Sequence, residues 1–303
     1  MDLRGKLRLK IAHGFAGIVR SIGIRGTTKA AHFISKLLLP KPSGKILITT
    51  VEGFDIYIDP LRDLGVERSI YYTGTMEPGT VSNLKSLISI SDTIIDVGAN
   101  IGFLSIIFSK LVGENGKILS FEPLESTRKL FIENIGLNSL KNINVFECAL
   151  GSRADNLPIF PHGKNRGMAS LMKHDSDNGI PAENISVKTL DSIIGIENKI
   201  KLIKIDAEGW ELEVLKGSPL ILKNKDAPIL CIECCTLRSI HGGTLADLFR
   251  LLCLDNTYKL YKSKKGMNRI CKMTQINSIN DFPDFDNILC FPSNHYNLIP
   301  SLT

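Results

Sequence analysis

The chain has 303 residues, of which 43% are hydrophobic and 22% are charged, as in an ordinary folded protein with a sizeable core. The net charge of +6 is concentrated in residues 1–50, which hold ten Lys or Arg against one acid. The rest of the chain has 27 basic and 30 acidic side chains, a balance of −3, which excludes a nucleic-acid-type basic surface on the main body. The seven cysteines are an odd number, and they predict buried free thiols in a reducing compartment.

Two helical stretches are predicted at the amino terminus. Apolar residues recur every three or four positions across residues 3–22, and a second helix is expected from Thr27 or Thr28 through Leu39. The first helix either covers the core with its lysines exposed or contacts an anionic membrane surface. The sequence has no apolar run of 18 residues and no secretory signal, so we expect a cytoplasmic protein. The membrane interpretation would place it peripherally on the inner face of the membrane, through residues 1–40.

The next segment predicts a hairpin and a covering helix. Strands at residues 45–51 and 54–59 flank a turn at Glu52-Gly53, residues 62–78 are expected to be irregular, and a helix covers about residues 80–90. We therefore divide the chain into a basic helical extension, residues 1–44, and a main domain, residues 45–303, whose first part is this 45–90 segment.

Strands and helices alternate from residue 93 onwards. We expect strands at 93–97, 117–122, 143–147, 200–206, 228–233, 258–262 and 287–291, and helices at 102–112, 126–138, 210–217 and 245–254. Alternating units with apolar strands predict a mostly parallel sheet with helices on both faces. Residues 151–190 interrupt the alternation with polar loops and short strands at 157–160, 169–172 and 185–189, which indicates an insertion near the active site.

The stretch Asp92 to Gly102 is the first candidate site. Its apolar strand ends at Asp96, and Gly98 and Gly102 then follow four positions apart before an apolar helix. Glycine has no Cβ, so such a turn can bring backbone N–H groups close to a ligand. Asp96 would lie at the carboxyl end of its strand, beside the ligand crevice of an open α/β sheet.

The next strand ends in a second acid, Glu122, which is placed to accept both hydroxyls of a ribose. A nicotinamide enzyme usually has a G-x-G-x-x-G turn that holds a pyrophosphate. Here the glycine spacing differs, and Asp96 would repel a pyrophosphate but suit the ammonium of an amino-acid-bearing nucleoside. This pattern favours S-adenosylmethionine as the cofactor over NAD. An NAD-dependent oxidoreductase and a non-catalytic nucleoside-binding protein of the same fold are the alternatives.

Four motifs carry a family resemblance: Asp96-Val-Gly-Ala-Asn-Ile-Gly102, Phe121-Glu-Pro123, Ala149-Leu-Gly151 and Lys204-Ile-Asp-Ala-Glu-Gly209. With these motifs in this order, the chain resembles the FkbM-type S-adenosylmethionine-dependent methyltransferase family. The resemblance implies a Rossmann-like class I methyltransferase fold with a seven-stranded sheet. It also implies O-methylation of a hydroxyl on a sugar, a polysaccharide or glycolipid precursor, or another natural product.

The resemblance also implies roles for the residues of the cofactor site. The methionine portion of the cofactor would be lined by Asp96, Gly98, Asn100 and Gly102. Glu122 would hold the ribose, and the backbone around Cys148 and Ala149 would border the adenine. Which side chain reads the adenine stays open, because Glu147 directly precedes that pair.

A hydroxyl acceptor benefits from a general base, worth roughly 10²–10⁴-fold in rate. The candidates for this base are Asp206, Glu208, Glu233 and His241, all at or just after strand ends, with Asp206, Glu208 and His241 as the predicted catalytic residues. Alternatively, Asp206 and Glu208 cap the helix that begins near Trp210, and His241 is merely exposed. Trp210 stands where the family commonly has a small residue, and it would narrow the acceptor pocket.

We expect no metal, although carboxylate oxygens such as those of Asp206 and Glu208 would suit Mg²⁺. Cys231 and Cys234 form a C-x-x-C pattern on a strand, where alternation points them to opposite faces and prevents a shared metal. The expected partner is a small-molecule or saccharide acceptor and not a nucleic acid. The sequence does not determine the oligomeric state.

Overall fold

The computed structural model describes residues 9, 11–14, 35, 37, 39–42, 44–162, 165–171, 183–195, 199–235 and 240–303. Leu9 and Ala12 belong to a helical stretch and are buried, and Nε2 of His13 lies 2.9 Å from the carbonyl oxygen of Tyr71 in helix α3 (Val66–Thr73). These contacts fit a helix that covers the core. Most of residues 1–40 lies outside the described residues, so the membrane-surface interpretation stays a prediction.

The central sheet has eight strands in the order β13-β12-β14-β11-β10-β3-β4-β5. Five neighbours, β5, β4, β3, β10 and β11, are parallel, while β14 is antiparallel to both β11 and β12. The strand bounds are β3 Thr93–Val97, β4 Lys117–Phe121, β5 Ile143–Phe146, β10 Leu202–Ile205, β11 Ile229–Cys235, β12 Lys259–Ser263, β13 Met273–Ile276 and β14 Phe285–Phe291. The predicted fold class is confirmed, but the sheet has one strand more than seven. The sequence did not predict β13, a four-residue strand that pairs with the edge of β12.

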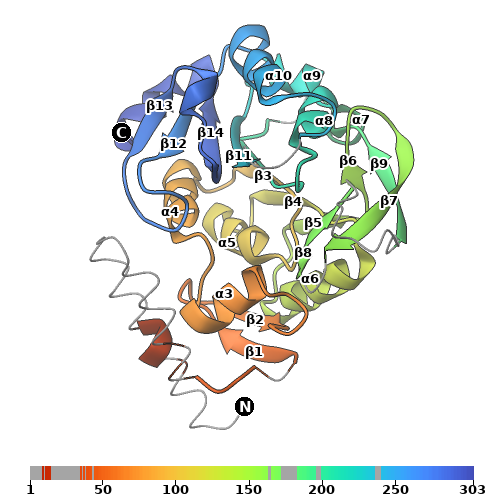
Figure 1. Cartoon of the computed structure of the whole chain (residues 1–303), viewed down its shortest axis with the longest axis vertical. Helices are drawn as coiled ribbons and strands as arrows, with labels where there is room; N and C mark the ends of the chain where they lie inside the picture. Colours follow the sequence, from red (N-terminus) through yellow and green to blue (C-terminus); the bar gives the residue numbers. More distant parts are fainter. Residues whose placement is uncertain are drawn as a thin grey trace.

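Helices cover both faces of this sheet, as predicted (Figure 1). Side chains alternate along β3, so Ile94 packs in the apolar cluster on one face of the sheet and Ile95 packs in the cluster on the other face. The first face is covered by α4 Pro78–Leu87, α5 Phe103–Val112 and α6 Glu125–Leu137. The second face is covered by α7 Leu190–Ile194, α8 Glu211–Lys216, α9 Pro219–Leu222 and α10 Leu245–Phe249, which continues as a π-helical turn, Arg250–Asp255. Cys231 and Cys234 lie in opposite clusters, as predicted, and all seven cysteines are unpaired.

The segment before β3 forms the predicted hairpin of β1 (Ile46–Thr49) and β2 (Asp55–Ile58). The buried side chain of Asn134 in α6 accepts the N–H of Tyr57 and donates to the carbonyl oxygens of Tyr57 and Ile101, which ties the hairpin to the turn after β3. The prediction that residues 62–78 are irregular is wrong. Helix α3 lies there, with Ile70 and Tyr71 buried; its short length and flanking glycines hid its period.

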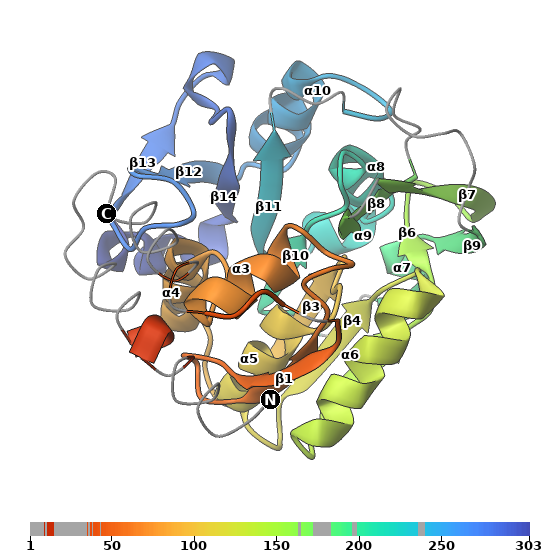
Figure 2. The ribbon, with the colours of Figure 1, turned by 60° about the horizontal axis from the view of Figure 1, so that its bottom comes forward.

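Residues 149–188 form a second sheet in the order β6-β9-β7-β8, with β6 Ala149–Leu150, β7 Asp155–His162, β8 Asn165–Ser170 and β9 Glu183–Lys188. The expected short strands overlap β7, β8 and β9, while residues 172–182 of the expected insertion lie outside the described residues. Figures 1 and 2 show β7 and β9 at the side of the molecule away from β12 and β13. The described part of the chain contains no helix long and apolar enough to cross a membrane.

Candidate active site

A cavity of about 530 Å³ lies at the carboxyl ends of β3, β4, β10 and β11. Its size is that of a small-molecule site. In the sheet, β4 follows on one side of β3 and β10 on the other, so this is the switch point at which open α/β sheets bind ligands. Asp96, Glu122, Asp206 and Glu233 all line the cavity, so the structure brings together the four strand-end acids that the sequence singled out.

The glycine turn after β3 joins three strand ends. The N–H groups of Gly98 and Ala99 both donate to the carbonyl oxygen of Phe121 at 3.0 Å. Gly98 has φ +76°, and a Cβ added to it would lie 1.8 Å from the backbone oxygen of Asp206. The prediction that this turn brings N–H groups to a ligand is therefore wrong for these two groups, because they hold β4. Glycine is required here by the close approach of β10.

Glu122 is buried, with 7% of its surface exposed, and its two oxygens accept the N–H groups of Asn100 at 2.9 Å and Leu124 at 3.0 Å. Burial raises the pKa of its carboxyl group to about 7. Each carboxylate oxygen can accept a further hydrogen bond. Oδ1 of Asn100 and Oγ1 of Thr127, on the same cavity wall, are buried without a partner among the described residues. These unsatisfied polar groups fit a ligand that supplies hydroxyls, as a ribose does.

Asp96 is 2% exposed and accepts the hydroxyl of Ser105 at 2.5 Å, and Ser105 in turn lies 2.9 Å from the hydroxyl of Ser120. Burial raises the pKa of Asp96 to about 6, so the carboxyl group is still largely ionised at neutral pH. An ionised carboxylate on this wall fits the ammonium of a methionine portion. Asn100 and Gly98 line the cavity beside it, whereas Gly102 lies against the ring of Phe131 in α6, where a Cβ would come within 2.0 Å.

Cys148 and Ala149 also line the cavity, as expected for the border of an adenine. Burial raises the pKa of the Cys148 thiol, which favours its neutral form in this apolar wall. The neighbouring Glu147 does not line the cavity; its side chain is 81% exposed and contacts Arg128 at 3.3 Å. At Cys148 and Ala149 the cavity wall therefore offers a ligand two small side chains and no carboxylate.

Three carboxylates meet on the opposite part of the wall. Oxygens of Glu77, Asp206 and Glu233 lie within 4.8 Å of one another. A hydroxyl oxygen of a substrate at the centre of such a triangle would be at most about 2.8 Å from each carboxylate oxygen, a distance at which it can donate a hydrogen bond to one of them. Burial raises the pKa values of Glu77 and Glu233. The sequence did not single out Glu77, because it lies before α4, far from any predicted strand end.

A buried cation accompanies these carboxylates. Lys204 has no exposed surface, and its Nζ donates to Oδ2 of Asp206 at 3.3 Å. Burial opposes its charge, but Asp206 and other acidic neighbours raise the pKa of the ammonium. Glu77 is held in turn by the side-chain amide of Asn287, which donates to its Oε2 at 2.7 Å.

The remaining predicted residues take different places. Glu208 lines the cavity, whereas His241 is exposed, does not line it, and stacks on Trp210 with ring centroids 4.1 Å apart. Trp210 itself is buried on the cavity wall, as a residue that narrows the pocket would be. The turn before α8 is capped by Glu211, whose carboxylate accepts the N–H groups of Ala207 and Gly209. Neither Asp206 nor Glu208 is needed as that cap.

The sheet and the nucleoside-type site together define a Rossmann-like class I methyltransferase. Residues 96–260, more than half of the chain, match the model of the methyltransferase FkbM domain, and the protein belongs to that family. It is an S-adenosylmethionine-dependent methyltransferase. When bound, the cofactor would supply an electrophilic methyl group on a sulfonium, and Asp96, Asn100, Glu122, Cys148 and Ala149, which line the cavity, are the residues that would hold it.

Two fungal proteins are similar in sequence. Methyltransferase 1 of Beauveria bassiana (strain ARSEF 2860) is 24% identical over 192 residues, which cover 56% of this chain and 74% of that protein. Methyltransferase sdnD of Sordaria araneosa is 31% identical over 155 residues, which cover 41% of this chain and 59% of that protein.

Solved structures with related architecture include M. jannaschii TYW2 in complex with AdoMet, at 13% identity and a TM-score of 0.42, with 83% of this chain and 86% of that chain covered. A SAM-dependent O-methyltransferase from Thermotoga maritima is 12% identical with a TM-score of 0.38, and 83% of this chain and 94% of that chain are covered.

Replacing Glu122 by Ala should weaken binding of S-adenosylhomocysteine by about 10- to 100-fold, because hydrogen bonds to a charged group contribute roughly 1.5–3 kcal/mol. Isothermal calorimetry measures this affinity. Glu125→Ala is the matched control, since Glu125 is exposed on α6 and outside the cavity lining. An affinity equal to that of the unaltered protein would remove the ribose assignment.

Cofactor affinity should also rise with pH between 5.5 and 7.5. The raised pKa values of Glu122, about 7, and Asp96, about 6, mean that both carboxyls take up protons as the pH falls through this range. If the ligand binds the ionised forms, affinity at pH 5.5 should be lower than at pH 7.5 by about tenfold or more. Calorimetry on Glu122→Ala should show a shallower dependence that reflects Asp96 alone; an equally steep one would contradict this origin.

Proposed function

We propose that the protein transfers a methyl group to a hydroxyl oxygen of an acceptor bound between the cofactor site and Asp206. The observation that carries this proposal is the set of oxygens of Glu77, Asp206 and Glu233 on the wall of the cavity that holds Asp96 and Glu122. A hydroxyl between these carboxylates could donate its proton to one of them as its oxygen bonds to the methyl carbon; the bond from that carbon to sulfur would break, and S-adenosylhomocysteine would leave.

In this proposal each residue has a defined task. Asp96 and Glu122 orient the cofactor, and Asp206 accepts the proton of the acceptor hydroxyl. Glu77 and Glu233 hold neighbouring hydroxyls of the acceptor, and Lys204 keeps a positive charge beside Asp206. Fixing both reactants in line accounts for much of the rate, since effective molarities of ~10⁵ M or more are reached in well-oriented reactions.

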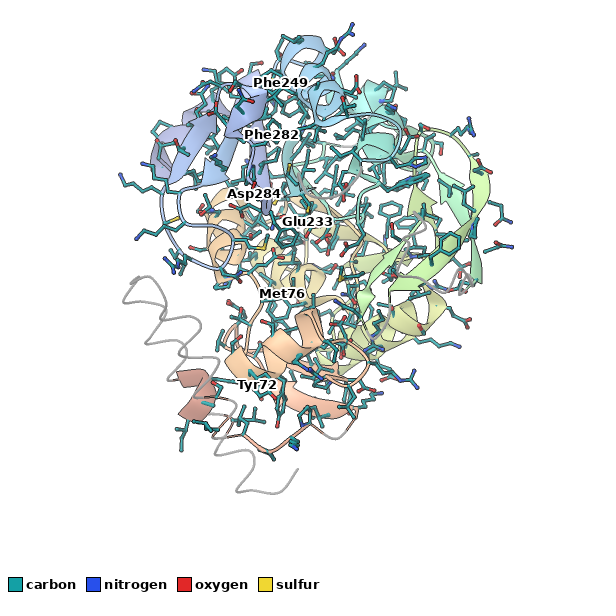
Figure 3. All side chains as sticks on the ribbon, viewed as in Figure 1. Tyr72, Met76, Glu233, Phe249, Phe282 and Asp284 are labelled. Carbon is teal, nitrogen blue, oxygen red and sulfur yellow. The ribbon has the colours of Figure 1, made fainter. Side chains whose placement is uncertain are left out.

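We further propose that the acceptor is a sugar, a polysaccharide or glycolipid precursor, or another hydroxylated natural product, as the family resemblance implies. The wall supports a ligand with both polar and apolar parts. Beside the carboxylates it includes Met76, Met168, Met267 and Phe285. Figure 3 labels Met76 and Glu233 in the middle of the molecule, and both residues line the cavity.

The test is to incubate the purified protein with methyl-labelled cofactor and small-molecule extracts of its source cells, and to isolate the labelled product. Nuclear magnetic resonance should show a methyl ether on a hydroxyl carbon. A methyl group on nitrogen or carbon would refute the O-methylation proposal. Cofactor binding without transfer to any compound would favour the non-catalytic alternative.

Lys204 already supplies a cation at the site, so we expect the same product yield when EDTA is present.

A further inference from the structure

Strand β8 (Asn165–Ser170) crosses the wall of the active-site cavity, and its residues from Asn165 to Ala169 line it. It belongs to the β7–β8 hairpin of the insertion and lies far in sequence from the segment that it meets. That segment, residues 59–67, precedes and enters α3, and Gly65 and Val66 on it line the same cavity. The two pieces together form one side of the ligand site.

A buried ion pair joins them. Glu67 has no exposed surface, and its Oε1 lies 2.6 Å from Nε and 2.5 Å from Nη2 of Arg166, whose side chain is 13% exposed. The other carboxylate oxygen accepts the N–H of Asp59. Beside this pair, Oδ2 of Asp63 accepts the N–H of Gly167 at 3.0 Å. One end of β8 is thus held by a charge pair and by a hydrogen bond from the backbone N–H of Gly167 to the Asp63 side chain.

The rest of β8 contacts Asn100 in the turn after β3 and the loop that follows Asp206. A Cβ added to Gly167 would lie 2.8 Å from Nδ2 of Asn100, so the strand rests directly on the cofactor turn. At the other end, the hydroxyl of Ser170 donates to the carbonyl oxygen of Glu208 at 2.9 Å, on the loop that follows Asp206. The strand therefore spans from the clamp, over Asn100, to the acceptor side.

We propose that Glu67 and Arg166 are positioning residues that hold β8 across the cavity and so set how long the cofactor and its demethylated product stay bound. Residues 59–67 precede the matched family domain, residues 96–260, so this clamp joins the domain to a segment outside it. Breaking the pair frees β8 to move away from Asn100. The inference rests on the proposed cofactor site.

Removing one partner alone would leave an uncompensated buried charge, whereas replacing both by apolar residues of similar volume is often tolerated by the fold. The test variant is therefore Glu67→Met with Arg166→Met. The matched control makes the same two changes in the exposed pair Glu125–Lys129 of α6. Melting temperatures of both double variants establish that they are folded.

The rate of S-adenosylhomocysteine dissociation is measured by stopped-flow fluorescence of Trp210, the one tryptophan of the chain, which lies on the cavity wall. We expect dissociation about tenfold faster in the Glu67/Arg166 variant and unchanged in the control, since interface changes act mostly on dissociation rates. KM for the cofactor should rise by a larger factor than any change in kcat, a split that general destabilisation does not produce.

The outcomes separate the two proposals. If the unaltered protein does not bind S-adenosylhomocysteine, the cofactor site itself is misassigned. If it binds and the folded double variant releases the product at the original rate, the clamp inference is overturned. Should the double variant not fold, Glu67→Gln decides: it keeps the acceptor for the N–H of Asp59 but loses the charge, and an unchanged release rate would again overturn the inference.

Discussion

Replacing Asp206 by Asn is expected to lower kcat by about 10²- to 10⁴-fold, the usual contribution of a general base. Asparagine keeps the size of the side chain but cannot take the proton of an acceptor hydroxyl. Among the carboxylates that meet in the cavity, Asp206 accepts a hydrogen bond from Nζ of Lys204 through its Oδ2. Single-turnover methyl transfer at saturating cofactor measures the chemical step directly.

The same variant should bind S-adenosylhomocysteine nearly as tightly as the unaltered protein, because Asp96 and Glu122 hold the cofactor end. Asp226→Asn is the control, since Asp226 is exposed and outside the cavity lining. A full rate in Asp206→Asn would show that Asp206 is not the base. Glu233→Gln and Glu77→Gln, measured in the same assay, would then identify which carboxylate is.

Gly98→Ala should both destabilise the fold and abolish cofactor binding. The methyl group would lie 1.8 Å from the backbone oxygen of Asp206, and φ +76° is strained for any residue with a Cβ. Strain and overpacking together should cost about 3 kcal/mol or more of unfolding free energy. In a chain of this size that lowers the melting temperature by about 5–10 °C. Displacing β10 from the turn would also move Asp206 away from the cofactor site.

Gly136→Ala is the matched control within the same sheet-and-helix unit. Gly136 lies in α6, and nothing lies within 4 Å of a Cβ added to it. Alanine there should stabilise the protein by about 0.5–1 kcal/mol, because it lowers the entropy lost on helix formation. Thermal unfolding and calorimetry compare the two variants. Normal stability and affinity in Gly98→Ala would mean that β10 does not approach the turn as closely as the structure has it.

The local sequence pattern was sufficient to predict the acids on the cofactor side of the cavity. Asp96 and Glu122 each end an apolar strand, and parallel strands place their carboxyl ends at one edge of a sheet, so the sequence predicts that these acids meet. The free cysteines on opposite faces of β11 follow from strand alternation in the same way. Helix α3 and strand β13 escaped prediction because each is short, and glycines flank the helix on both sides.

The acceptor half depended on long-range packing. Glu77 joins Asp206 and Glu233 only because α4 is packed beside β14, where Asn287 holds its carboxylate. The Glu67–Arg166 pair joins residues 99 positions apart. His241 follows β11 in sequence, yet Trp210 fills the space between it and the cavity. By itself the sequence determined seven strands of the sheet and the acids at the strand ends, because these follow from periodicity and strand direction. The glycine spacing, the charge of Asp96 and the family resemblance indicated the cofactor. Only the tertiary structure decided which distant side chains complete the acceptor site and clamp β8, because residue type does not specify which remote segments pack together.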